Sequence, residues 1–205
     1  MIGPVRVGVI AEDFNFASFL VPVIVAEAGK AGAIVRVFRP EVTGGCQPEA
    51  LRRSWLRLSP SCDVVVVGAD SDGAWHRQRS ASARQKAANL SRILGVADLR
   101  LVFAVAEPSV EAWLMADPEA FREGLKEALG MTFRPPAHWP VPQREREAKE
   151  ALTRLVHDAL GDHLSRDGFE FADSIVPRMS LERPQALAQF VRDLSGAIER
   201  AAHAP

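Results

Sequence analysis

Tyrosine is absent from the chain of 205 residues, and cysteine is scarce. Without tyrosine, the chain alone cannot use the tyrosine nucleophile of topoisomerase strand passage or tyrosine recombination. The 2 cysteines, Cys46 and Cys62, form no CxxC motif and no Cys/His cluster. We therefore expect neither a disulfide scaffold nor a structural zinc site, and two reduced thiols in a cytoplasmic protein.

The chain also lacks an excess of one charge and a long apolar run. It has 25 Lys and Arg against 26 Asp and Glu, a formal net charge of -1, so any basic surface for nucleic acid must be local. The apolar run 16–26 is too short to cross a bilayer, and we expect no membrane segment and no export signal. With 47% hydrophobic and 25% charged residues, the composition is that of a soluble globular chain.

Apolar runs alternate with helical patterns along the first two thirds of the chain. The run 63–68 is continuously apolar, which is typical of a strand covered on both faces. The alternation predicts an α/β fold with an open, mostly parallel sheet and helices on both faces. Strands are expected over 5–10, 34–38, 63–68 and 100–106. Helices are expected over 16–30, 48–58, 76–94 and 107–115, and again from 118 onward.

Four prolines between 134 and 143 interrupt any regular element. We place a boundary there, between an α/β domain over 1–133 and, over 134–205, a proline-rich connection with a small helical C-terminal extension that packs on it. The extension is expected to hold a charged helix over 144–160, an irregular stretch over 161–177 and an amphipathic helix over 181–201. The apolar stripe of that last helix is expected to pack on the sheet or on a partner.

Acidic residues stand where the predicted strands end. Glu12 follows the first strand, Asp70 and Asp72 follow the third, and Glu107 follows the fourth, with Glu111 four residues later. The carboxyl ends of parallel strands open into the crevice where ligands bind, and residues four apart share a helix face. We therefore expect these five carboxylates on one rim.

Carboxylates this close together must bind protons or a cation, since two like charges about 4 Å apart cost about 4 kcal/mol at an effective dielectric near 20. Carboxylates without His or Cys nearby favour Mg²⁺ or Mn²⁺ over zinc. Two such ions, about 3.5–4 Å apart, stabilise the attacking water and the leaving oxygen of an in-line displacement, and no protein nucleophile is needed. The predicted reaction is phosphodiester hydrolysis.

A basic run follows the acidic pair. We expect Arg77 and Arg79, with Arg84 and Lys86, to contact phosphates, and Trp75 to stack on a base. The alternative is a solvated face of a helix.

Taken together, these motifs resemble a TOPRIM-like domain. The likeness rests on Glu12, on the sequence Asp70-Ser71-Asp72 and most specifically on residues 106–117, and it covers about residues 5–120. The chain is similar to small stand-alone TOPRIM-like proteins, distant relatives of the OLD-type nucleases, and residues 180–194 also look like the closing signature of that group.

The resemblance implies Mg²⁺ held by Asp70 and Asp72, with Glu12 as general acid or base and as a further metal ligand. Either Glu107 or Glu111 fills the third acidic position. Because the primase members need further domains and the topoisomerases need tyrosine, we expect a Mg²⁺-dependent nuclease that acts in defence against foreign nucleic acid, such as phage.

One motif departs from the family. Relatives carry Glu-Gly-x-Thr/Ser-Glu after the first strand, whereas this chain has Phe16 at the second acid and Asp13 at the glycine. Three consequences stay open: Asp13 supplies the lost charge, one metal binds, or activity is weakened. The alternatives to a nuclease are a catalytically degenerate module that binds nucleic acid or a protein partner such as an ATPase, and a nucleotide-sugar transferase that uses the DxD motif.

Overall fold

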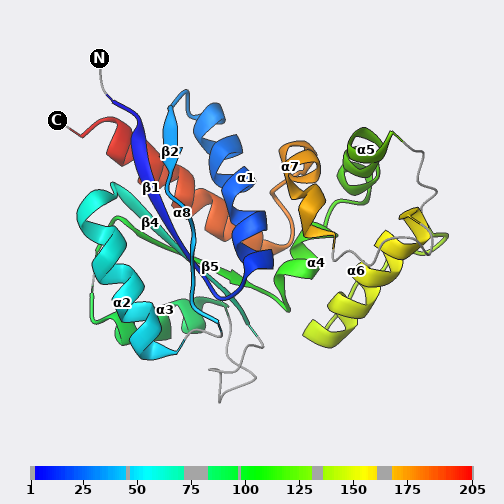
Figure 1. Ribbon diagram of the computed structural model, residues 1–205, viewed down its shortest axis with the longest axis horizontal. Coiled ribbons are helices and arrows are strands. Elements are labelled where there is room, and N and C mark those ends of the chain that lie inside the picture. Colours follow the sequence, from blue (N-terminus) through cyan, green and yellow to red (C-terminus); the bar gives the residue numbers. More distant parts are fainter. Residues whose placement is uncertain are drawn as a thin grey trace.

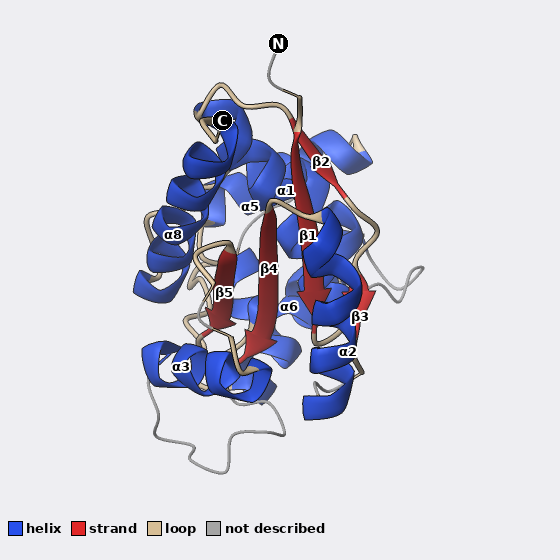
Figure 2. Cartoon of the chain, turned by 90° about the vertical axis from the view of Figure 1, so that its left-hand side faces the viewer, coloured by secondary structure: helices blue, strands red, loops and turns tan. Residues whose placement is uncertain are grey.

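All the strands that the structure describes run parallel in one sheet (Figure 2). The structure is a computed structural model that describes residues 3–44, 47–71, 83–96, 98–130, 136–160 and 168–204. Its strands are β1 (Val5–Ala11), β2 (Val35–Val37), β3 (Glu41–Val42), β4 (Val64–Asp70) and β5 (Leu101–Ala106). Their order is β2-β1-β4-β5, and the short β3 pairs with the end of β1. The two strands that precede Glu12 and end in Asp70 are therefore neighbours.

Helices cover both faces of the sheet, as the alternating pattern predicted (Figures 1 and 2). Side chains of β1 and β4 point alternately to two apolar clusters, Val64 and Val66 to one and Val65 and Val67 to the other. The first cluster includes α1 and α8, and the second includes α2 and α3. The helices are α1 (Phe14–Lys30), α2 (Pro48–Leu58), α3 (Ala83–Leu94), α4 (Val110–Leu114), α5 (Pro118–Leu129), α6 (Glu145–Leu160), α7 (Ala172–Ile175) and α8 (Gln185–Ala202).

Several element boundaries differ from the sequence prediction. The helix expected from 107 begins at Val110, because Ser109 has an extended backbone and is its N-cap, so that Pro108 lies outside the first turn. The stretch 161–177, expected to be irregular, includes helical turns from Phe169 onward. The short β3 was missed because two residues carry no periodicity. Residues 72–82, at the start of the helix expected over 76–94, lie outside the described residues.

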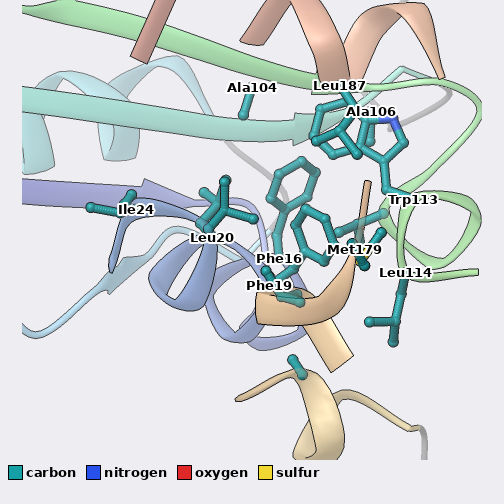
Figure 3. Close-up of a cluster of buried hydrophobic side chains, with 14 of the residues drawn as sticks. Phe16, Phe19, Leu20, Ile24, Ala104, Ala106, Trp113, Leu114, Met179 and Leu187 are labelled. Carbon is teal, nitrogen blue, oxygen red and sulfur yellow. The ribbon is translucent and has the colours of Figure 1, made fainter. Parts of the chain in front are cut away.

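The C-terminal helix α8 completes the core on one face of the sheet. Its apolar stripe is buried against β5, β4 and α1, so it packs on the sheet. The ring of Phe190 stacks on Trp113 from α4 at 6.1 Å between centroids. Phe16 and Phe19 from α1 pack against the same indole (Figure 3). Within the described residues, no helix has the length and apolar character needed to cross a membrane.

Candidate active site

Glu12 is held in the turn between β1 and α1, facing the end of β4. Its Oε2 accepts a hydrogen bond of 3.1 Å from the backbone N–H of Asp70, and its own N–H donates to the Gly68 carbonyl at 3.0 Å. The next residue, Asp13, caps α1 by accepting from the Phe16 N–H at 2.8 Å. The parallel pairing of β1 with β4 thus brings the first two predicted acids together.

Asp70 is the last residue of β4 and its side chain is almost completely buried. One carboxylate oxygen, Oδ1, accepts a hydrogen bond of 2.8 Å from the N–H of Val110, where α4 begins. Burial raises the pKa of Asp70 to about 8, the negative charges of Glu111 and Glu12 act in the same direction, and the Val110 N–H opposes them. At neutral pH this carboxyl group therefore keeps its proton unless a cation replaces it.

Glu111, in α4, is the third acid at this end of the sheet. It is only 3% exposed, and its Oε2 is a buried atom without a hydrogen-bond partner. Burial raises the pKa of Glu111, and the nearby Ser109 hydroxyl and the Lys149 ammonium act against that rise. An unpartnered buried carboxylate oxygen is costly, so this atom is well suited to a cation or a proton.

Glu107 lies apart from these acids. The prediction that it shares a helix face with Glu111 is wrong, because α4 begins only at Val110. Its side chain is exposed, and its Oε1 accepts a hydrogen bond of 2.6 Å from the N–H of Ala83, where α3 begins. Of the two residues eligible for the third acidic position, the structure places Glu111 beside Asp70.

The C-terminal extension adds a cation that the sequence analysis missed. Helix α6 packs on α4, and the Lys149 charge lowers the pKa of both Glu12 and Glu111. Burial by itself lowers the pKa of Lys149. The negative charges of Glu145, whose carboxylate lies 2.5 Å from the ammonium, and of Glu111 and Asp70 outweigh burial, so the pKa of Lys149 is raised. In the sequence, Glu145 and Lys149 show only the four-residue spacing of a solvated helix, which carries no signal for this position.

Two members of the predicted basic run are described. Arg84 is exposed on α3, as a phosphate contact requires. Lys86 is instead buried, and its ammonium donates to the carbonyl of Ser71, the residue after Asp70, rather than lying at the surface. The other residues predicted for metal, phosphate or base contacts lie outside the described residues: Asp72, Trp75, Arg77 and Arg79.

The described acids do not form a complete metal cage. In the part of the chain that the structure covers, no three His, Cys, Asp or Glu side chains are arranged to hold an ion by themselves. Mg²⁺ commonly takes one or two carboxylates from a protein and completes its octahedron with water and substrate phosphate. Comparison with family models, with curated proteins and with solved structures finds no match to this chain.

Proposed function

We propose that the chain is a TOPRIM-like nuclease that hydrolyses phosphodiester bonds of nucleic acid with Mg²⁺ or Mn²⁺. The observation that supports this most is Asp70, buried at the carboxyl end of a parallel strand, hydrogen-bonded to α4 and flanked by Glu12 and Glu111. In open parallel sheets this edge is where ligands bind, and strongly perturbed carboxyl groups mark functional sites.

The donor set fits a hard divalent cation. Asp70 and Glu111 offer carboxylate oxygens, one of them buried without a partner, and among the described residues no His or Cys joins them. These two residues, with Asp72, would hold the ion. Bound there, Mg²⁺ would supply charge for the phosphate oxygens and acidify a water molecule.

The remaining groups position and transfer protons. Glu12 is fixed by the Asp70 N–H, and burial raises its pKa, so its carboxylate suits the general base that takes a proton from the attacking water. Lys149 places a positive charge beside the acids to attract phosphate. Arg77, Arg79 and Trp75 are proposed to guide the strand, and a role in defence, alone or with an ATPase partner, is part of the same proposal.

Metal binding tests the proposal directly. At pH 7 calorimetry with MgCl₂ or MnCl₂ should show release of about one proton per ion, because Asp70, with a pKa of about 8, must lose its proton to bind a cation. The heat will therefore differ between buffers of different ionisation enthalpy, and affinity will rise from about pH 6 to about pH 8.5.

The same samples, incubated with plasmid and with RNA, report cleavage. Asp70→Asn should remove both the binding and the proton release. Absence of binding at millimolar metal would contradict the proposal and favour a catalytically degenerate module that binds nucleic acid or a protein. One observation favours that second candidate: Phe16, at the position of the second family acid, is a core residue.

Changing Lys149 to alanine should raise KM for a nucleic-acid substrate several-fold and leave kcat nearly unchanged. The reason is that an exposed ammonium near the acids contributes about 1 kcal/mol or less to phosphate binding. Steady-state cleavage kinetics at low and high salt measure this change in KM. Salt screens the charge of Lys149, so the difference in KM between wild type and variant should shrink at high salt. Lys126→Ala removes a comparable exposed lysine of α5, paired with Glu123, and serves as the matched control. Equal KM changes in the two variants would refute the role of Lys149.

A further inference from the structure

A groove of about 880 Å³ runs along the outer edge of the sheet, between α3 and α8. Figure 2 shows the two helices beside β5. Its floor is β5, the last strand of the sheet, and Glu107 is the one residue it shares with the acids predicted for catalysis. Leu101, Phe103 and Phe190 give the floor and one wall an apolar character. The groove is therefore separate from the candidate active site formed by Glu12, Asp70 and Glu111.

The outer edge of β5 carries backbone groups without partners. Hydrogen bonds of 2.8 Å from Val65 N to Arg100 O and from Ser71 N to Ala106 O fix which residues of β5 bond to β4. By alternation, Phe103 and Val105 turn their N–H and C=O groups toward the groove. In the described chain neither residue has a backbone hydrogen bond on that side. Such an edge is a template for one more strand.

Three arginines line the walls of this groove. Arg84 comes from α3, and Arg192 and Arg200 come from α8. Among the described residues, none of the three forms an ion pair with a carboxylate. Arg192 donates to the Gln189 side-chain oxygen at 2.8 Å and Arg200 to the Leu99 carbonyl at 3.2 Å, each through one nitrogen of the guanidinium group. The remaining N–H groups can bind carboxylates.

The acids of the lining are already engaged. Asp98 is bound by Arg100 at 2.7 Å, and Asp193 accepts from Gln189 at 2.9 Å. Glu107 accepts from the backbone of α3. Arg100 neutralises Asp98, whereas Asp193 and Glu107 bond to neutral donors and keep their charges. The three arginines of the lining therefore outnumber its two remaining carboxylates, and the groove is weakly positive.

We propose that this groove binds an extended, acidic peptide segment of a partner protein, which adds a strand to β5. Backbone hydrogen bonds to Phe103 and Val105 hold the segment, apolar side chains rest on the floor, and carboxylates meet Arg84 on one wall and Arg192 and Arg200 on the other. Unpaired N–H and C=O groups that recur every second residue match a peptide backbone, and this repeat favours a peptide over a nucleic-acid strand.

The test starts from a phage-displayed library of random eight-residue peptides, selected on the full chain. Enriched sequences should alternate β-branched residues with Asp or Glu. Synthetic, fluorescein-labelled versions should bind in fluorescence anisotropy and weaken about tenfold or more on Arg200→Glu. They should weaken likewise on Phe103→Pro, which removes an outward N–H that an edge strand does not need for folding. Thermal unfolding checks that both variants fold.

Three results would overturn the proposal. The first is a selection without enrichment. The second is peptide binding that both variants retain. The third is a labelled 12-mer of single-stranded DNA or RNA that occupies the groove, loses affinity on Arg200→Glu and displaces the peptides, since that assigns the arginines to nucleic acid. Arg53→Glu, at an exposed position on α2, is the charge-matched control that should leave peptide binding unchanged.

Discussion

Replacing Asp70 with asparagine will abolish metal-dependent cleavage of nucleic acid and leave the fold in place. Asparagine keeps an oxygen that can accept the Val110 N–H, so the link between β4 and α4 is retained, but it removes the charge that an ion requires. Removing a group that supports a metal ligand typically lowers metal affinity or activity by about 10–100-fold. Removing a ligand itself should therefore lower kcat/KM by at least about a hundredfold. Plasmid nicking and RNA cleavage in Mg²⁺ and in Mn²⁺ measure the effect.

Two further variants separate catalysis from folding. Asp70→Ala also loses the hydrogen bond to Val110 and should lower the melting temperature, whereas Asp70→Asn should not. Asp63→Asn changes a more exposed aspartate, which pairs with Arg6 at 2.6 Å. Asp63 directly precedes β4, at the end of the strand away from Asp70, so this variant should leave cleavage unchanged. Cleavage by Asp70→Asn at the wild-type rate would show that the acids at this edge do not catalyse the reaction.

The meeting of Glu12 and Asp70 could be predicted because it follows from topology. The apolar runs of β1 and β4 are long and strongly β-branched, and every residue of β4 is buried. Parallel strands point their carboxyl ends the same way, so an acid at the end of each comes to one edge. The two acids then meet if their strands are neighbours in the sheet, as β1 and β4 are.

Other parts of the site depend on packing that no local pattern records. Which of Glu107 and Glu111 lies beside Asp70 depends on where α4 begins. The helix begins at Val110, three residues after Glu107, and therefore includes Glu111 but not Glu107. Lys86 has the spacing of a solvated helix, yet α3 places its ammonium on the Ser71 carbonyl in the interior. The approach of Lys149 requires α6 to fold back on α4 after a proline-rich connection, and helical periodicity does not specify its direction.

The same packing bears on the point where the first motif departs from the TOPRIM-like pattern that it resembles. Phe16 is 1% exposed, and a Cβ atom on Gly68 of β4 would lie 2.5 Å from its Cδ1, so the ring fills the space above that glycine. On its other side it packs edge-on against Trp113 (Figure 3). Asp13, in contrast, is only partly buried, and its charge raises the pKa of Glu12 and Asp70. Of the two, Asp13 stands where it can contribute negative charge to the site.

Placing the second acid of the TOPRIM-like pattern in this chain by Phe16→Glu should therefore unfold the protein or destabilise it by more than about 3 kcal/mol. Loss of a buried phenyl ring alone costs about 3–5 kcal/mol, and a carboxylate in its place has no partner. Phe16→Leu, which keeps an apolar side chain, is the control and should cost far less. Urea unfolding followed by circular dichroism measures both. A Phe16→Glu protein that folds as well as the leucine variant and cleaves faster than wild type would mean that this position belongs to the site. Unfolding of the Phe16→Glu variant would mean instead that the hydrophobic core requires an apolar side chain at this position.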